Sequence, residues 1–317
     1  MKIFRMFVAT AFISMSLGIP RTSGALTVSS MSTLFAGRNI YAPTVIYDEQ
    51  EGVYKMWYGG WQSSYDAPND RIYYRYSFDS VNWSVPTTVI SPFGVHYAGV
   101  HANDPSVTKT YNEITNAWQY TIFYTLCYGG CSDAESEIWS AVSGDGVNWY
   151  YHQSVLPNGA TNPSVIYEPD TNGAVWKLYY INRVEGAQEV KMVQVDGLRF
   201  AITTPISVFQ PASTTVGDLE VRQIAGVWTL FYNKMGATNV DLYFAESLDN
   251  ASFPSSSPFI VTAGSPHFCA ALTPGVLPLS GGSYKLFFSL TEMPLNNQGN
   301  CDLQNRTQAI QLWDITP

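Results

Sequence analysis

One short phrase recurs five times along this chain, and it constrains the fold more than any other feature. Each copy begins with an acidic or small residue, usually continues with Pro and ends in Val, and an aromatic-rich run follows after a gap. The copies begin at Ala42, Asp104, Asn162, Asp218 and Thr273. Successive copies are separated by 62, 58, 56 and 55 residues. Such a near-constant period with strand-like content predicts a repeat architecture.

A second phrase fixes the internal order of each repeat. Downstream of four copies, a strand-like run ends in a turn with Asp and then an aromatic residue; these acids are Asp79, Asp145, Asp196 and Asp249. Such turns join antiparallel strands, and an Asp that bonds its own backbone accounts for them without any catalytic role. Each repeat therefore predicts four antiparallel strands, and five repeats predict an all-β, five-bladed β-propeller.

The fifth repeat lacks its last strand. Residues 309–315 form its third strand and run into the C-terminus, whereas the apolar residues 26–35 belong to no repeat. We expect this N-terminal segment to supply the missing outer strand and to close the ring, because closure removes two exposed sheet edges. The alternative is a loosely attached leader.

The first 25 residues have the composition of a signal peptide. Lys2 and Arg5 form a positive start, residues 6–19 form an apolar core, and small residues at 23–25 provide a cleavage site. An uncleaved anchor is the alternative. Because no later run approaches transmembrane length, we expect residues 26–317 to form a single propeller domain that is secreted, extracellular or periplasmic.

The charge balance points away from nucleic acid. Loss of Lys2, Arg5 and Arg21 reduces the basic residues from 16 to 13 against 25 acidic ones, a net charge of −12. An acidic chain repels nucleic acid and anionic membranes. Charged residues make up 13% of the chain and aromatic residues 15%, which favours a neutral, sugar-like partner such as an oligo- or polysaccharide. We expect a monomer.

Four cysteines lie in the exported part of the chain. In an oxidising compartment an even number predicts disulfides, and three connectivities are possible. The local pattern, Cys127 with Cys131 and Cys269 with Cys301, joins loops on one face. A zinc site is the competing interpretation, and the lack of histidines at metal-ligand spacing disfavours it.

Blade topology predicts which residues meet. If the first strand of each blade lines the central channel, the first residue of each phrase points at the channel mouth, at the end where the long loops lie. Asp104 and Asp218 occupy two of these positions, and Glu220 lies two residues further along the same strand face. Converging carboxyl groups in a concave site are what cleavage of a glycosidic bond requires.

Three short phrases of the sequence resemble those of a known family. The phrases at residues 103–107, 57–60 and 145–149 resemble those of the glycoside hydrolase superfamily of arabinanases, β-xylosidases, invertases and levansucrases (families 43, 62, 32 and 68). The resemblance implies a base or nucleophile Asp opening the first blade, a tuning Asp one blade on, and a general acid Glu in a later blade. Ala42 occupies the first position, so it implies Asp104 and either Glu220 or Asp218 as the catalytic pair.

Further residues are candidates for binding substrate. Trp61 and Tyr128 could stack on sugar rings, and the polar candidates for hydroxyl or carboxylate groups are Arg71, His101, Asn162, Arg183 and Lys234. The resemblance adds His267, because relatives often keep a channel histidine. It also suggests a structural Ca²⁺ in the channel, although no dedicated carboxylate loop is present and no cofactor is expected.

The leading hypothesis is a secreted glycoside hydrolase acting on plant or microbial glycans. Two alternatives remain. One is a non-catalytic carbohydrate-binding propeller, which Ala42 favours, and the other is an interaction scaffold with a disulfide-braced rim.

Overall fold

The computed structural model describes residues 27–61, 69–91, 100–112, 115–128, 135–170, 173–184, 188–211, 215–236, 239–262, 268–292 and 307–316. The predicted signal peptide at residues 1–25 lies outside these ranges. The described residues are almost entirely β-strand, with one short 3-10 turn at Ser280–Gly282. None of the helices in these ranges is long and apolar enough to span a membrane.

Three of the sheets each contain four consecutive strands in antiparallel order, as the repeat predicts. The first sheet contains β2 (Ile40–Asp48), β3 (Val53–Gly60), β4 (Arg71–Ser77) and β5 (Thr87–Ile90); the second contains β6 (His101–Asn112), β7 (Ala117–Cys127), β8 (Ser136–Ser143) and β9 (Tyr150–Leu156); the third contains β10 (Ala160–Asp170), β11 (Gly173–Asn182), β12 (Glu189–Val195) and β13 (Ile206–Phe209). Each sheet begins with one copy of the recurring phrase.

The remaining strands form one larger sheet of mixed direction. Its strands are β1 (Thr27–Arg38), β14 (Thr215–Ile224), β15 (Val227–Met235), β16 (Val240–Ser247), β17 (Ser256–Ile260), β18 (Phe268–Pro278), β19 (Tyr284–Glu292) and β20 (Thr307–Thr316). A single parallel pair, Val240 with Ala270, joins the β14–β17 group to the β18–β20 group. The N-terminal strand β1 pairs antiparallel with β20, from Thr27 opposite Thr316 to Arg38 opposite Thr307.

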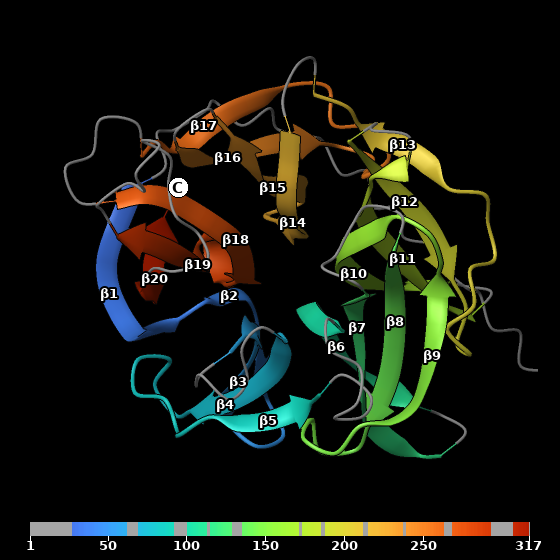
Figure 1. The fold of residues 1–317 in the computed structure, drawn as a ribbon. Coiled ribbons are helices and arrows are strands. Elements are labelled where there is room, and N and C mark those ends of the chain that lie inside the picture. The colour runs from blue at the N-terminus through green and yellow to red at the C-terminus, as the bar shows by residue number, and fades with distance from the viewer. Residues whose placement is uncertain are drawn as a thin grey trace, which may run out of the picture.

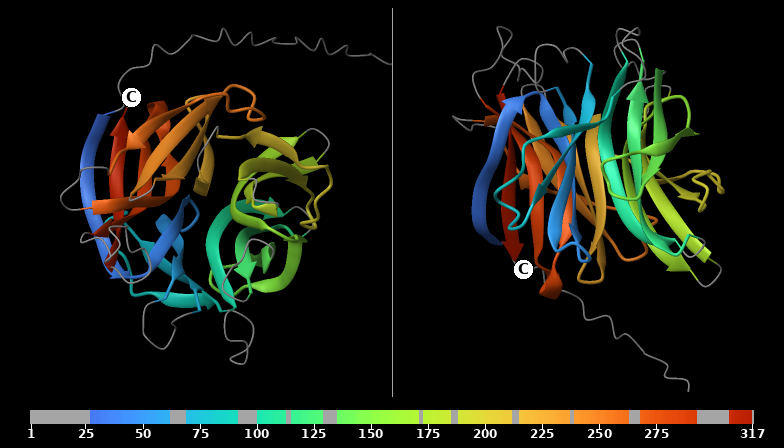
Figure 2. Two further views of the ribbon diagram at one scale, coloured as in Figure 1. Left: turned by 45° about the horizontal axis from the view of Figure 1, so that its top comes forward. Right: turned by 90° about the horizontal axis from the view of Figure 1, so that it is seen from below.

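The sheets are arranged radially around a central axis (Figures 1 and 2). The first strands β2, β6, β10, β14 and β18 surround the axis, and the short last strands lie on the outside. Neighbouring sheets pack face to face through aromatic side chains: Trp57 of the first sheet is fully buried against Tyr120 and Trp149 of the second. Burial of an aromatic side chain this large is a major contribution to stability, of about 2 to 3 kcal/mol.

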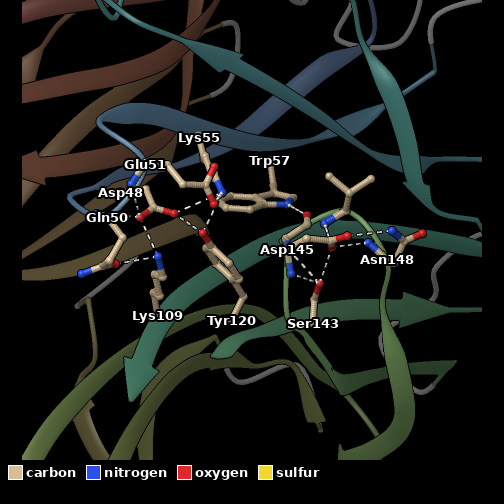
Figure 3. Close-up of polar contacts among 12 residues, drawn as sticks. Asp48, Gln50, Glu51, Lys55, Trp57, Lys109, Tyr120, Ser143, Asp145 and Asn148 are labelled. Atoms are coloured by element: carbon tan, nitrogen blue, oxygen red, sulfur yellow. Dashed lines mark hydrogen bonds and ion pairs between the residues drawn. The ribbon is translucent and has the colours of Figure 1, made fainter. Parts of the chain in front are cut away.

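The Asp turns are structural, as predicted. Asp145 Oδ1 accepts hydrogen bonds from the backbone amides of Val147 and Asn148, each at 2.8 Å, and the carbonyl of the next residue, Gly146, accepts one from Trp57 Nε1 at 2.8 Å (Figure 3). The turn therefore also anchors the first sheet to the second. The aromatic residue that follows the turn at Asp196, Phe200, is 54% exposed and is therefore not packed between sheets.

Replacing Asp145 by Ala is expected to reduce the free energy of unfolding by about 1 to 2 kcal/mol, because two backbone amides lose their acceptor. Chemical denaturation should show a lower midpoint with an unchanged slope. Asp145→Asn keeps one acceptor oxygen and serves as the matched control, with a smaller loss. Equal midpoints for all three proteins would contradict this role.

A buried polar cluster also joins the first two sheets, on the side of the Asp turns (Figure 3). Asp48 ends β2, and its carboxylate contacts Lys109 Nζ at 2.5 Å, Lys55 Nζ at 3.1 Å and the hydroxyl of Tyr120. Lys55 is only 2% exposed and also contacts Glu51 at 2.7 Å. Burial raises the pKa of Asp48, but the hydrogen bonds from these three partners outweigh it and hold the pKa far below its usual value.

Candidate active site

Each of the five innermost strands contains a β-bulge at the recurring phrase. The regular pairing of β6 with β7 is interrupted between Asn103 and Ser106, and the same interruption occurs at the equivalent position of β2, β10, β14 and β18. A bulge removes residues from the ladder and redirects their side chains. Four of these first residues, Asp104, Asn162, Asp218 and Thr273, line the cavity at the channel mouth, and Ala42 lines only the narrower channel cavity.

Four of the bulged residues adopt a left-handed backbone conformation that is rare outside glycine. The φ angles are 51° for Ala42, 48° for Asp104, 53° for Asn162 and 54° for Thr273. Each is followed by Pro, which has no amide hydrogen to lose from the ladder. Such a conformation costs about 1 to 3 kcal/mol per residue and persists only where the surrounding structure enforces it.

A cavity of about 640 Å³ lies at the mouth of the channel. Its lining includes the ends of strands from the first, second and third sheets and from the larger sheet. The ionisable residues in the lining are Asp70, His101, Asp104, Arg183 and Asp218. A smaller cavity of about 20 Å³ continues into the channel and shares Asp104, Asn162, Asp218 and Thr273 with the larger one.

Asp218 is held by amide side chains. Asn162 Nδ2 donates to Asp218 Oδ1, and Asn233 Nδ2 donates to Oδ2 at 3.0 Å. Arg183 lies behind Asn162, with its Nη2 at 3.4 Å from Asn162 Oδ1. Burial raises the pKa of Asp218 to about 6, and the charge of Arg183 opposes this rise. The side-chain amides of Asn162 and Asn233 therefore hold the Asp218 carboxyl group in place by hydrogen bonds and do not cancel its charge.

Asp104 is the more strongly perturbed acid. Burial, reinforced by the charge of Asp218, raises the pKa of Asp104 well above its ordinary value, while Thr125 and Arg183 oppose the rise. The amide of Asn103 lies 3.3 Å from Asp104 Oδ2 in the orientation in which its oxygen accepts from Tyr41. Two neighbouring buried carboxyl groups therefore favour a state in which Asp104 carries a proton.

A third acid, Asp70, lies in the cavity wall and was not predicted. It immediately precedes β4, and its Oδ1 accepts from Asn39 Nδ2 at 2.9 Å while Oδ2 contacts His101 Nδ1 at 2.9 Å. The hydroxyl of Tyr41 is also close to Asp70 and Asn103. Burial, then the charges of Asp70 and Asp104, raise the pKa of Tyr41 well above its usual value. Asp70, Asn39 and His101 thus form one connected group.

Glu220 does not line the mouth cavity, but it converges with Asp104 and Asp218 on the narrower channel cavity. It lies in the narrower channel cavity, where its Oε1 is 2.6 Å from Arg222 Nη2 and its Oε2 accepts from Ser164 Oγ at 2.9 Å. The bulge between Gly217 and Leu219 interrupts the two-residue alternation of the strand, and Asp218 reaches the mouth cavity while Glu220 does not. Paired and buried, Glu220 has the contacts of a structural carboxylate.

The predicted binding residues divide into two groups. Trp61, His101, Asn162 and Arg183 line the mouth cavity, as expected. The residues that do not line it are Arg71, Tyr128, which is 40% exposed, and Lys234, which lies over the ring of Tyr243 at 4.9 Å. His267 lies outside the described residues.

Two of the four cysteines, Cys127 and Cys269, lie in the described part of the chain. Cys127 and Cys269 are buried, and neither is a free thiol; Cys131 and Cys301 lie outside the described residues, so the pairing stays a prediction. Within the described ranges, no group of three or more His, Cys, Asp or Glu residues is placed to hold a metal ion. The calcium ion suggested for the channel likewise stays a prediction.

Two signals in the sequence could have identified the missed residues. Asn103 directly precedes Asp104 in the recurring phrase and lies at the edge of the bulge. It was therefore a candidate for the wall of the same cavity. Asp70 ends the long loop between β3 and β4, and such loops were expected at the mouth. Asn39 carries no comparable signal, because it lies in the connection between β1 and β2.

Comparison with known proteins supports the fold. No protein-family profile matches the chain, and no curated protein matches it by sequence. Among solved structures, an α-L-arabinofuranosidase from Lactobacillus brevis superimposes with a TM-score of 0.65 at 14% identity, covering 88% of this chain and 91% of that one. An arabinanase from Bacillus subtilis gives 0.60 at 13% identity, covering 88% and 96%.

A further solved structure has a different activity in its name. An N-acetylgalactosamine deacetylase from F. plautii, in complex with blood group B trisaccharide, superimposes with a TM-score of 0.64 at 13% identity, covering 92% of this chain and 95% of that chain. Identities this low establish a shared fold. The chemistry of this chain has to be argued from its own residues.

Proposed function

We propose that the protein hydrolyses glycosidic bonds in oligo- or polysaccharides and that the mouth cavity is its active site. The observation that carries the proposal is the pair of buried carboxyl groups, Asp104 and Asp218, in the wall of a 640 Å³ cavity. A cavity of this size accommodates one or a few sugar units. The arabinofuranosidase and arabinanase with the same fold support the choice of substrate class.

The two carboxyl groups have different roles in this proposal. Asp104, whose raised pKa keeps it protonated, donates its proton to the oxygen of the departing sugar. Asp218 is ionised above about pH 6 and stabilises the positive charge that develops at the anomeric carbon. Arg183 and the amides of Asn162 and Asn233 hold Asp218 in place. Trp61, in the same wall, offers an aromatic surface for a sugar ring.

A second function, non-catalytic carbohydrate binding, is favoured by one observation. Ala42 stands at the first-blade position where the resembling glycoside hydrolases carry a catalytic Asp. A binding propeller would use the same cavity without proton transfer.

The test is a screen of the purified protein against nitrophenyl glycosides and soluble polysaccharides, with Asp104→Asn as the matched control. Release of nitrophenol or reducing sugar by the wild type, and not by the variant, is the expected result. Retardation in a polysaccharide gel without release would replace the proposal by the binding function. Neither binding nor release across the panel would overturn both.

We also propose the finer architecture that the repeat suggests. The larger sheet would be two blades, β14–β17 and β18–β20 with β1, which together with the three separate sheets gives five. The pairing of β1 with β20 and the single parallel pair between the two groups support this division. The ring would then be closed by the N-terminal strand.

Export and disulfide formation belong to the same proposal. The composition of residues 1–25 and the absence of free thiols among the described cysteines support a secreted protein in an oxidising compartment. Cys127 would pair with Cys131, and Cys269 with Cys301.

A further inference from the structure

Hydrolysis of a glycosidic bond needs a group that activates water, in addition to the proton donor. Glu220 is withdrawn from the cavity by its ion pair with Arg222, and position 42 carries Ala. Asp104 and Asp218 already act as proton donor and charge stabiliser in the proposed function, so the candidates left in the described cavity wall are Asp70 and His101.

Both oxygens of Asp70 are already in use. Oδ1 accepts from Asn39 Nδ2 and Oδ2 contacts His101 Nδ1, each at 2.9 Å. The side chains of Asp70 and His101 are only 11% and 12% exposed, so water competes little for these contacts. Asp70 is therefore placed to orient His101, not to attack a substrate or a water molecule itself.

Two contacts with Asp70 bear on which ring nitrogen of His101 carries a proton. The backbone amide of Asp70 donates to Nδ1 at 3.2 Å, and the carboxylate oxygen Asp70 Oδ2 lies 2.9 Å from the same nitrogen; the shorter, charge-assisted contact favours a proton on Nδ1. The neutral imidazole then has its lone pair on Nε2. Among the described residues, Nε2 has no hydrogen-bond partner, and His101 lines the cavity.

His101 lies on the same strand, and in the same cavity wall, as the proposed proton donor. It lies on β6, three residues before Asp104, at the strand end that borders the cavity. The other ionisable groups facing this part of the cavity are Tyr41, Asp70 and Asp218, with Arg183 beyond Asn162.

We propose that His101 is the general base of the hydrolysis and that Asp70 is its positioning residue, an inference that rests on the proposed function. His101 Nε2 takes a proton from water as the water oxygen bonds to the anomeric carbon. The bond from that carbon to the departing oxygen breaks, and this oxygen takes the proton of Asp104. One water is consumed, and the proton on His101 returns to Asp104 through solvent.

The decisive experiment combines His101→Ala with added imidazole. The variant is expected to lose about 10²- to 10⁴-fold in kcat, and imidazole in solution is expected to restore part of that loss, because it can occupy the space left by the side chain. A role in binding a sugar hydroxyl would instead raise KM and give no rescue. His152→Gln is the matched control: His152 contacts Tyr124 at 3.0 Å and is not part of the described cavity lining, so its rate is expected to match the wild type.

A second measurement tests the pairing without activity. Nitrogen-15 NMR of the wild type is expected to show His101 protonated at Nδ1, and Asp70→Asn is expected to shift the signal and to lower kcat with little change in KM. Protonation at Nε2 alone would overturn the inference. So would an active enzyme whose His101→Ala variant keeps its rate, or loses it without rescue. A wild type without hydrolytic activity would overturn the proposed function and the catalytic role together.

Discussion

Replacing Asp104 by Asn is expected to lower the rate of glycoside hydrolysis by about 10²- to 10⁴-fold, equivalent to about 3 to 5 kcal/mol in the barrier. Asn has nearly the same shape but no proton to donate to the departing oxygen. The rate should be measured on whichever substrate the screen identifies, and the thermal midpoint of unfolding should be measured in parallel. Because Asp104 is buried beside Asp218, removing its carboxyl group should leave the folded structure intact or slightly more stable.

The pH profile and one further variant make this prediction specific. Activity requires protonated Asp104 and ionised Asp218, so the wild-type rate should fall as pH drops below about 6 and fall again as pH rises through the raised pKa of Asp104. Glu220→Gln is the comparison, because Glu220 is paired with Arg222 outside the mouth cavity. A larger loss of rate in Glu220→Gln than in Asp104→Asn would return the acid role to Glu220.

Asp48→Asn is expected to produce the largest loss of stability, about 3 to 5 kcal/mol in the free energy of unfolding, because it leaves Lys55 and Lys109 without their buried counter-charge. Denaturation midpoints at neutral pH test this directly. Glu51→Gln is the matched control: Glu51 contacts the same Lys55 at 2.7 Å but is 54% exposed, so its loss should stay below about 1 kcal/mol.

The same cluster predicts a direction for acid sensitivity. The pKa of Asp48 is lower in the folded protein than in the unfolded chain, so its contribution to stability is complete above the unfolded value of about 4 and is lost as pH falls through the folded value. The difference in midpoint between the wild type and Asp48→Asn should therefore shrink as pH is lowered below about 4. A difference that stays constant down to pH 2 or grows on acidification would contradict the ion pairing of Asp48.

The repeat made most of the strand order predictable. A phrase that returns at nearly constant spacing can be recognised because each copy forms the same local structure. The Asp turns are predictable because their hydrogen bonds involve only near neighbours in the sequence, as at Asp145. Asp104 and Asp218 were predictable for the same reason. Each begins a copy of the phrase, and each lies in the mouth cavity.

Each residue that the sequence analysis misplaced or missed has a physical cause. Glu220 was assigned by the alternation of an ideal strand, which the bulge at position 218 interrupts. Asp70 and Asn39 contact each other across 31 positions of sequence, a pairing that no local pattern encodes. Trp118 is 44% exposed, and its ring packs against Tyr111 within its own hairpin.

The bulges have a consequence for how chemistry is distributed on this scaffold. At each bulge, the first residue of the phrase is released from strand pairing, so its side chain is free to line a cavity and is not needed for the hydrogen-bond ladder. Five such sites encircle one axis, and they carry Ala42, Asp104, Asn162, Asp218 and Thr273. One repeated backbone feature thus presents a methyl group, two carboxyl groups, an amide and a hydroxyl group to the same channel, and the chemistry of the channel depends on which side chain each copy carries.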